Sequence, residues 1–460
     1  MIKEYKNGRF EGELDELGNR VNGTFFYKNG NIYEGEWLFE KKHGKGKLTY
    51  KGGDKYEGYW EYDKKSGTGT YTFANGSFYI GDFAFDLRHG NGTMYYKNLD
   101  VYKGEWKKDK CTGNGVYTFV NNERYEGQFK NGLFHGKGIY YWNDGDIYEG
   151  EWRKGFRQGK GSYTWVEGRK IVGKYKKNNI NGKCILTLPN GDRYEGGWKN
   201  NQKHGKGKFV WQSGETYNGG WKNDKKHGKG VWTSADGKLE YRGYYVEGVR
   251  HGKGLLKHSE TGAYCKGQFV NGKLTGKGEY KFDNGNFYKG MLKEGVPCGK
   301  GEMLYADGRK YTGDFDKGVA NGKGTYILTS GQINVGEFKD GVPHGFNECT
   351  FSDGTRYRGE WCKGLVHGFG TMWLANGLMY CGIFTNDKIT GKGTMIYKNG
   401  TSIECEFENG VATGKGVIKF LNGDKYEGDI VKGSMHGNGT FTLKNGRVYK
   451  GKWQNDKFVG

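Results

Sequence analysis

Proline and long apolar runs are the scarcest features of this chain of 460 residues. Only 3 residues are Pro, and hydrophobic residues make up 34% of the sequence. A membrane-spanning helix needs about 20 consecutive apolar residues, and no run approaches that length, so the sequence predicts none. The first residues, Met1-Ile2-Lys3-Glu4-Tyr5, are not apolar, and neither end carries a lipidation motif. We therefore expect neither a signal peptide nor a lipid anchor.

Cysteines are few, and their spacing is irregular. The 8 Cys residues include no Cys-x-x-Cys pair. They are Cys111, Cys184, Cys265, Cys298, Cys349, Cys362, Cys381 and Cys405. Disulfide frameworks and zinc sites use close, regular spacings. The pattern predicts free thiols in a reducing, cytoplasmic setting, with no metal and no cofactor.

Signatures of enzymes are also missing. Gly-Lys is common, but Ser or Thr never follows it, so there is no P-loop for phosphate. HExxH, Gly-x-Ser-x-Gly and complete EF-hand loops do not occur. Asp144 and Asp146 resemble the start of a calcium loop, yet they fall in an expected hairpin turn. The sequence predicts no catalytic residue and no enzymatic activity.

Glycine and aromatic residues are abundant instead. Gly accounts for 87 residues, and aromatic residues make up 16% of the chain. Disordered chains are poor in aromatic residues, so this composition argues against disorder. Because the apolar material is concentrated in rings, we expect a thin core rather than a deep globular one.

A repeat of 23 residues organises this composition. Aligned on the pattern Tyr-x-Gly, with the first residue as position 0, the chain forms 20 repeats from Phe10 to Tyr449. Position +2 is Gly in 19 of the 20 repeats, and position +4 is aromatic in 17 of the 20. Two extra residues precede Tyr241 and Cys265, which predicts two longer hairpins.

Each repeat predicts one β-hairpin. The segment Tyr33-Glu34-Gly35-Glu36-Trp37 alternates with a period of two, which is typical of a strand with its rings on one face and its acids on the other. Asn-Gly or Asp-Gly then marks a turn. A loop of three residues, with Gly left-handed and a bulge, places Leu48 and Tyr50 on the face of Tyr56. The expected fold is all-β: an elongated single-layer antiparallel sheet of tandem 23-residue hairpins, with rings lying over glycines.

The repeat resembles a known family. Tyr33-Glu34-Gly35-Glu36-Trp37 followed by His43-Gly44-Lys45-Gly46 is similar to the consensus of the MORN repeat almost letter for letter. The resemblance implies a short lead-in over residues 1–9 and a continuous array of about 20 MORN repeats over residues 10–460, the last one incomplete. It further implies a radial-spoke-type subunit of a ciliary axoneme, or a component of a membrane skeleton.

The aromatic face is the first predicted site. Nothing else in the chain is left to cover it, and exposed apolar surface of this size marks an interaction site. An amphipathic helix of a partner, or a second copy of the chain, would cover it. Alternatively, twist lets neighbouring rings bury one another. The predicted partner-binding residues are Tyr33, Trp37, Tyr56, Trp60, Tyr102, Trp106, Tyr148, Trp152, Tyr194, Trp198, Tyr217, Trp221, Tyr357 and Trp361.

A ladder of lysines is the second predicted site. The formal net charge is +21, and position +12 is Lys in nine consecutive repeats. These residues are Lys137, Lys160, Lys183, Lys206, Lys229, Lys253, Lys277, Lys300 and Lys323. The ladder fits an anionic membrane or an acidic protein. Alternatively, it is a solvated face partly neutralised by glutamates such as Glu149 and Glu151. Nucleic acid fits less well, because its binders expose stacking rings and here the rings belong to the repeat.

Other unusual positions have a structural explanation as well as a functional one. Nine of the ten His residues stand at position +10, about 10 Å apart, too far to share a zinc ion. Pro297 and Pro343 are expected in the loop between the two strands of a repeat. Cys265, Asn334 and Ile403 replace the ring at position 0, either as docking points or by drift.

Composition and spacing thus predict a non-enzymatic scaffold that binds proteins along an aromatic groove in the cytoplasm. The resemblance to the MORN family implies in addition that the protein is a subunit of an axoneme. The alternative is a peripheral linker between membrane and cytoskeleton that binds phosphoinositides through the lysine ladder. The first prediction depends on the rings, and the second depends on the lysines.

Overall fold

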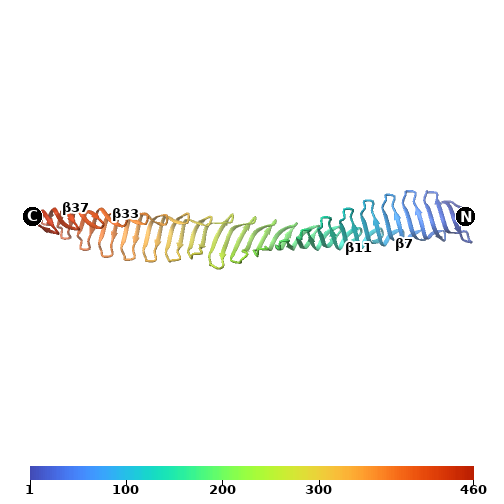
Figure 1. Cartoon of the computed structure of the whole chain (residues 1–460), viewed down its shortest axis with the longest axis horizontal. Coiled ribbons are helices and arrows are strands. Elements are labelled where there is room, and N and C mark those ends of the chain that lie inside the picture. Colours follow the sequence, from blue (N-terminus) through green and yellow to red (C-terminus); the bar gives the residue numbers. More distant parts are fainter. The chain divides into compact units, whose positions relative to one another are not determined.

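The structure, a computed structural model, describes every residue from Met1 to Gly460. It contains 41 strands and no helix (Figure 1). Contacts divide the chain into two compact units, an N-terminal unit over Met1–Gly228 and a C-terminal unit over Lys229–Gly460. Strand β21 (Lys225–Thr233) contains the division. Within each unit, strands pair antiparallel with their neighbours in the sequence.

The N-terminal unit contains the strands before β21. They are β1 (Ile2–Tyr5), β2 (Gly8–Leu14), β3 (Arg20–Tyr27), β4 (Ile32–Leu38), β5 (Lys41–Thr49), β6 (Lys55–Glu61), β7 (Lys64–Thr72), β8 (Phe78–Ala84), β9 (Leu87–Tyr95), β10 (Val101–Lys107), β11 (Lys110–Thr118), β12 (Arg124–Lys130), β13 (Leu133–Tyr141), β14 (Ile147–Arg153), β15 (Phe156–Thr164), β16 (Lys170–Lys176), β17 (Asn179–Thr187), β18 (Arg193–Lys199), β19 (Gln202–Val210) and β20 (Thr216–Lys222).

The C-terminal unit contains the strands after β21. They are β22 (Leu239–Val246), β23 (Val249–His258), β24 (Tyr264–Val270), β25 (Lys273–Lys281), β26 (Phe287–Lys293), β27 (Val296–Leu304), β28 (Lys310–Asp316), β29 (Val319–Ile327), β30 (Ile333–Lys339), β31 (Val342–Thr350), β32 (Arg356–Cys362), β33 (Leu365–Trp373), β34 (Met379–Thr385), β35 (Lys388–Ile396), β36 (Ser402–Glu408), β37 (Val411–Lys419), β38 (Lys425–Val431), β39 (Ser434–Thr442), β40 (Val448–Gln454) and β41 (Lys457–Phe458).

The two strands of a repeat are joined by a two-residue turn. Between β4 and β5, Phe39 and Glu40 are both left-handed, with φ of 50° and 63°. Two left-handed residues in a row make the type I′ turn, whose twist matches that of the flanking strands. The register shifts between Gly35 and Trp37, so β5 bulges before it pairs again.

Consecutive repeats are joined by a three-residue loop, as the sequence predicted. Between β5 and β6, the Tyr50 N–H donates to the Asp54 carbonyl at 2.9 Å, and the Gly53 N–H donates to the Tyr50 carbonyl at 3.0 Å. Gly53 has a φ of 96°, which only Gly adopts without strain. This loop keeps the apolar side chains of both strands on one face.

The two extra residues lengthen two loops, which confirms the predicted longer hairpins. The Ser234 N–H donates to the Leu239 carbonyl, so the loop between them has four residues. The His258 N–H donates to the Ala263 carbonyl around a second loop of the same length. Both insertions leave the strand pairing intact, because a loop absorbs an extra residue at little cost.

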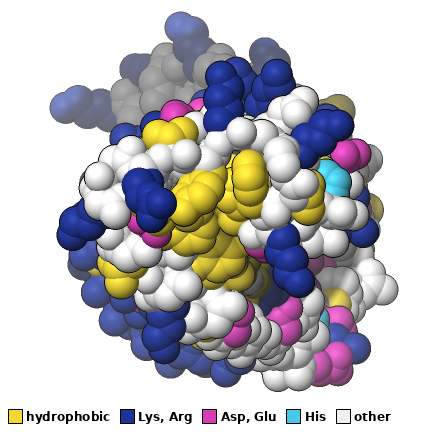
Figure 2. Space-filling view, turned by 90° about the vertical axis from the view of Figure 1, so that its left-hand side faces the viewer, with side chains coloured by type: hydrophobic (Ala, Val, Ile, Leu, Met, Phe, Trp, Pro, Cys, Tyr) yellow, Lys and Arg dark blue, Asp and Glu magenta, His cyan; other side chains and the backbone are white.

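One face of the sheet carries the core, and we call it the inner face. It holds the residues at positions 0 and +4, and the tyrosines at position 0 are buried almost without exception. Figure 2 views the C-terminal end of the chain, where hydrophobic side chains gather in the middle and Lys and Arg side chains surround them. The predicted all-β fold, a single-layer antiparallel sheet of tandem 23-residue hairpins, is confirmed.

The predicted position of two prolines was wrong. Pro297 and Pro343 lie in strands β27 and β31, where each is the second residue, and not in the loop before them. Pro297 pairs with Leu292 and Pro343 pairs with Phe338, beside the turn. A strand tolerates Pro close to its start, where the missing N–H costs least.

Candidate partner-binding face

The ring at position 0 lies flat on the glycines of the sheet. A methyl group added to Gly46 would come within 2.5 Å of Cζ of Tyr33, so the ring needs this residue to be Gly. The Tyr33 hydroxyl donates to the Glu36 carbonyl at 2.9 Å. The same bond, from position 0 to the carbonyl at +3, recurs in both units, for example from Tyr148 and Tyr357. The predicted placement of rings over glycines is thereby confirmed.

Each of these tyrosines is held between two rings. Tyr33 meets Trp37 of its own repeat edge-on at 4.9 Å and Trp60 of the next repeat at 5.5 Å between ring centroids. Edge-to-face pairs contribute about 0.5–1.5 kcal/mol beyond burial. The indole of Trp60 also donates to the Gly46 carbonyl at 3.1 Å. A zigzag of rings therefore joins neighbouring repeats wherever positions 0 and +4 both carry rings.

The predicted partner-binding rings are mostly covered by the chain itself. Residues Tyr33, Tyr56, Tyr102, Tyr148, Tyr194 and Tyr217 have no exposed surface, and Tyr357 is 1% exposed. The Trp residues are 3–7% exposed at positions 37, 60, 106, 152, 221 and 361, and Trp198 is half-buried. A partner on this face would meet their outer edges and the side chains beside them. Their role in partner binding stays a prediction.

A second row of rings is more accessible. Positions +15 and +17 place half-buried rings beside the covered ones in the N-terminal unit. Members of this row are Tyr71, Phe73, Tyr96, Tyr117, Phe119, Tyr140, Trp142, Tyr163 and Trp165. Several hydroxyl groups in the row are fixed, as when Tyr71 donates to Asp54 at 2.6 Å and Tyr117 donates to Asp100 at 2.8 Å. This outer row presents apolar surface with a few anchored polar groups.

The row of cations at position +9 on the inner face was not predicted from the sequence. The residue types at this position differ between the two units. In the N-terminal unit it carries cations that lie over rings. Arg88 is 4.3 Å from the ring of Trp106, and Lys203 is 5.0 Å from the ring of Trp221. The members are Lys42, Lys65, Arg88, Arg157, Lys203 and Lys226, with Cys111, Phe134 and Ile180 between them. A count of residue types at every position of the repeat would have revealed the row.

In the C-terminal unit the same position is almost entirely apolar. Arg250, over the ring of Tyr241 at 4.7 Å, is followed by eight apolar residues. These are Leu274, Pro297, Ala320, Pro343, Val366, Ile389, Ala412 and Met435. The inner faces of the two units therefore differ in charge although their folds are alike.

Burial shifts the pKa of several inner-face groups. Burial lowers the pKa of the Lys65 ammonium, which nearby Asp86 partly offsets, and it lowers the pKa of the Lys203 ammonium in the same way. Burial also raises the pKa of the Cys111 thiol to about 11. The thiols of this chain that are most covered are thus the least ionised.

Two cavities open on the inner face of the N-terminal unit. One of about 670 Å³ lies between Phe73, Met94, Cys111, Phe129 and Phe134. The other, of about 460 Å³, surrounds Ile171. Volumes of this order are typical of ligand sites, which span roughly 300–1,000 Å³.

The lysine ladder lies on the opposite, outer face, with positions +1 and +3. All nine lysines are exposed. Lys300 pairs with Asp314 at 2.8 Å, and Lys229 lies 5.5 Å from the ring of Tyr244. The Lys160 backbone N–H donates to the Glu151 carboxylate at 3.1 Å, so an acid lies beside this lysine. Lys183 and Lys206 face Gly197 and Gly220 on the next strand, so no carboxylate opposes these two lysines there. At Lys183 and Lys206 the neutralisation that glutamates provide elsewhere is missing.

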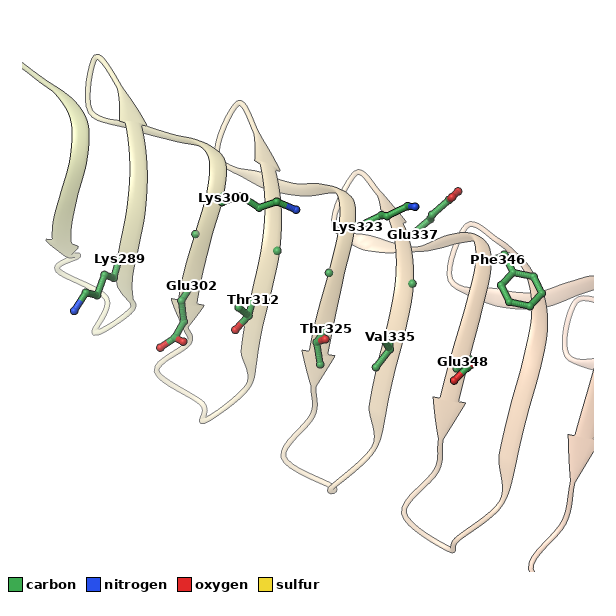
Figure 3. Close-up of a pocket in the computed structure, with 14 residues that line it drawn as sticks. Lys289, Lys300, Glu302, Thr312, Lys323, Thr325, Val335, Glu337, Phe346 and Glu348 are labelled. Atoms are coloured by element: carbon green, nitrogen blue, oxygen red, sulfur yellow. The ribbon is translucent and has the colours of Figure 1, made fainter.

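Glycines form the floor of a groove between two rows of outer-face side chains. In the C-terminal unit Lys300, Lys323, Glu337 and Phe346 form one wall, and a second row that includes Glu302, Thr312 and Val335 forms the other (Figure 3). The glycines between them leave an open volume of about 1140 Å³. Both signs of charge line this groove, so it has no clear preference for an anion or a cation.

No three His, Cys, Asp or Glu side chains come together as a possible metal site in the described chain. The cysteines are all free, and Cys111, Cys184, Cys349 and Cys405 are buried. No helix combines the length and apolar composition of a membrane span. These findings leave the inner face and the lysine ladder as the candidate sites.

The family follows from the repeats. The profile of the MORN repeat matches residues 33–55, 56–78, 79–101, 102–124, 125–147, 148–168, 172–193, 194–216, 217–238, 241–259, 265–287, 288–308, 311–333, 335–356, 357–379, 380–402, 406–425 and 426–446. The chain belongs to the MORN repeat family. The hairpins of this MORN protein before residue 33 and after residue 446 lie outside the matched stretches. MORN repeats form repeat scaffolds that mediate protein or membrane interactions.

No further relative of this MORN protein is established by its similarity to curated sequences or solved structures. No curated protein sequence matches it. The TCP domain of SAS-4 (dCPAP) of Drosophila melanogaster, in complex with a proline-rich motif of Ana2, is 14% identical, with 34% of this chain and 85% of that chain covered and a TM-score of 0.24. The TCP10 domain of Danio rerio CPAP in complex with a STIL peptide is 13% identical. The match covers 61% of this chain and 98% of that chain, with a TM-score of 0.18. Virginiamycin B lyase of Staphylococcus aureus is 10% identical. The match covers 77% of this chain and 100% of that chain, with a TM-score of 0.12. TM-scores this low do not establish a shared fold.

Proposed function

We propose that this MORN protein is a non-enzymatic structural scaffold that binds other proteins along its inner face. The observation that carries the proposal is the row of half-buried rings at positions +15 and +17. The rings at position 0 already hold the sheet together, so the second row is free to contact a partner. Aromatic side chains are enriched at protein interfaces because they bury large areas with little loss of entropy.

The proposed setting is the axoneme of a cilium, within the cytoplasmic cytoskeleton. The resemblance of this array of MORN repeats to radial-spoke-type proteins supports this setting. An amphipathic helix or a second MORN chain is the proposed occupant of the inner face, because its apolar side chains would cover the exposed ring edges.

The test replaces Trp142 and Trp165 with Gln in the full chain. Both rings belong to the accessible row, whereas Trp152 is only 6% exposed, so its replacement would mainly test folding. We expect the variant to fold but to leave the cytoskeletal fraction when cells that produce it are extracted with non-ionic detergent. A variant with Tyr59 and Tyr62 replaced by Gln is the matched control, because these rings are exposed away from the inner face. Normal retention of the Trp variant would contradict the proposal.

A second candidate function is binding to anionic lipid, including phosphoinositides, through the lysine ladder. The specific observation is that Lys183 and Lys206 face glycines, and not carboxylates, on the next strand. Phe346 and Phe369 continue position +12 after the ladder and are 50% and 59% exposed. Each lysine near an anionic surface contributes about 1 kcal/mol. Such a surface would link a membrane to the cytoskeleton.

The lipid candidate is tested with anionic vesicles. Replacing Lys160, Lys183 and Lys206 with Glu should abolish co-sedimentation, and added salt should weaken it in the unchanged protein. The control replaces Lys108, Lys154 and Lys177 with Glu. These lysines occupy a turn position at which other repeats of this chain carry Glu247 and Glu294. Equal binding by both variants would rule out the ladder as a lipid site.

A further inference from the structure

The cavity of about 460 Å³ on the inner face of the N-terminal unit lies at an irregular repeat. At position 0 of this repeat Ile171 replaces the tyrosine, and at position +13 Cys184 replaces the glycine on which that ring would lie. The Cys184 side chain fills the space over Gly173, since a methyl group there would meet its Sγ. Ile171 lines the cavity at a position where most repeats carry a tyrosine.

The same repeat reverses the charge beside the cavity. The residue two positions before position 0 is acidic in the repeats around it, as with Asp100, Asp146 and Asp192, but here it is Arg169. At position +15 Leu186 replaces the tyrosine whose hydroxyl binds that acid elsewhere. An acid–hydroxyl pair has thus become a cation beside an apolar side chain.

Two further cations from the neighbouring repeats line the cavity. Arg157 and Lys203 occupy position +9 on either side of Ile180, and all three residues contribute to the lining. The Arg157 guanidinium is 5.2 Å from the ring of Tyr163, and the Lys203 ammonium is 5.0 Å from the ring of Trp221. Both cations are therefore held in place by rings and need no rearrangement to meet a ligand.

Carboxylates do not balance these cations. Asp224, the one acid in the lining, accepts the backbone N–H of Lys203 at 2.9 Å. Arg169, 3.8 Å from the ring of Trp165, pairs with Glu167 at 3.3 Å, but that carboxylate is 51% exposed. Exposed pairs contribute about 0–1 kcal/mol, so a ligand can displace Glu167. Three cations and one acid leave the cavity cationic.

Resting on the proposed scaffold function, we propose that this cavity binds an acidic side chain of a partner protein. Its carboxylate would lie among Arg157, Arg169 and Lys203, and a neighbouring apolar residue would pack on Trp165, Ile171 and Leu186. Guanidinium groups match the planar carboxylate. The apolar walls distinguish a peptide from free phosphate, and the partly buried cations lie on the face opposite the ladder, away from any membrane that the ladder would contact.

The test uses the full chain and two labelled peptides. One alternates Glu with Leu, and the other has every Glu replaced by Gln. Fluorescence anisotropy should show binding of the Glu peptide at least about tenfold tighter, because a charge pair shielded from water is strongly favoured over its neutral analogue. Salt should weaken the binding of the Glu peptide alone. Equal affinity of the two peptides would overturn the proposal.

Variants locate the binding. Changing Arg157→Gln together with Lys203→Gln should remove the preference for the Glu peptide. The control Arg88→Gln, at the same position of another repeat and paired with Asp109 at 3.0 Å, should keep it. A second variant, Ile171→Tyr with Cys184→Gly, restores a regular repeat, fills the cavity and should also remove the preference while the protein stays folded. A preference that survives in both variants would place the site elsewhere.

The outcomes separate this inference from the scaffold function. Equal binding of both peptides, lost in the Trp142 and Trp165 variant, would leave the scaffold function standing and refute the acidic site. Loss of vesicle binding in the Arg157 and Lys203 variant would identify the cavity as a site for lipid headgroups and would also refute it. If inorganic phosphate competes with both peptides and the Glu peptide is not preferred, the cavity is an anion site and the proposal is likewise refuted.

Discussion

Asn347 fills the space that Asn334 leaves open on the inner face. Asn334 stands at position 0, and its side chain is too short to reach the carbonyl groups that the tyrosine hydroxyl binds in other repeats. The Asn347 side-chain amide donates instead to the carbonyls of Glu337, at 2.9 Å, and His344, at 3.1 Å. Tyr426 donates to the two equivalent carbonyls in its own repeat, both at 2.9 Å. The two substitutions therefore compensate each other.

This compensation predicts strong coupling between the two positions. Asn347→Gly alone should lower the free energy of unfolding by about 1–3 kcal/mol, because it opens a cavity and leaves two buried carbonyls without a donor. Asn334→Tyr alone should also destabilise, because the ring would collide with Asn347. The double variant should recover most of the loss. Urea unfolding of all four proteins gives the coupling energy, and additive losses would show that the residues are independent.

The tyrosine hydroxyl itself is expected to contribute measurably to stability. Tyr148→Phe removes the donor to the Glu151 carbonyl at 3.1 Å and should cost about 1 kcal/mol. Tyr59→Phe is the matched control, because Tyr59 is 43% exposed and its hydroxyl can bind water. Thermal unfolding followed by circular dichroism measures both. A loss of equal size in both variants would mean that the bond contributes nothing.

Stability should fall steeply in alkaline solution. Burial raises the pKa of Tyr50, Tyr96, Tyr288, Tyr311 and Tyr380 to about 12 each. The unfolded chain releases these protons near pH 10, so it binds fewer protons than the folded chain at higher pH. The stabilisation is complete below pH 10 and is lost as the pH rises toward about 12. Urea midpoints across this interval check the sign, and a flat profile would contradict it.

One buried cation should be dispensable for folding. The Lys65 ammonium is 4.8 Å from the ring of Tyr71, and burial lowers its pKa. Lys65→Met keeps the length of the side chain and removes a partly desolvated charge, so stability should stay equal or rise by about 1 kcal/mol. Lys42→Met is the comparison, since Lys42 pairs with Asp63 at 3.0 Å. A clear loss in the Lys65 variant would show that its contacts with the rings outweigh desolvation.

The thiols should differ in reactivity according to burial. Burial raises the pKa of both Cys111 and Cys349 to about 11, well above that of an exposed thiol, which lowers their thiolate fraction by about two orders of magnitude. Cys298, Cys362 and Cys381 are less buried and should react first with a thiol reagent. Mass spectrometry of timed samples gives the order, and denaturation should abolish it.

The repeat pattern was enough to predict the hairpins, because local signals fixed them. The alternation from Tyr33 to Trp37 and the Gly at each three-residue loop determine strand, face and register without distant contacts. The degree of burial was harder to predict. Whether Tyr33 is exposed or covered depends on Trp60 in the next repeat, and this contact between repeats is not visible in the spacing within one repeat.

The candidate sites were predicted less completely than the fold. The lysines at position +12 stand out because one residue type recurs, whereas position +9 mixes Lys, Arg, Cys, Phe and Ile. The cavity around Ile171 depends on four substitutions that are unremarkable one at a time. Only their common position in space shows that they remove a ring and reverse a charge.

The turns and loops return the chain to the same register after each repeat, and strands in both units contact their neighbours in the sequence. A gene that encodes such a chain can gain or lose one block without disturbing the packing of blocks elsewhere. The number of repeats then becomes an adjustable quantity, which natural selection can match to the spacing of the molecules that the scaffold has to hold.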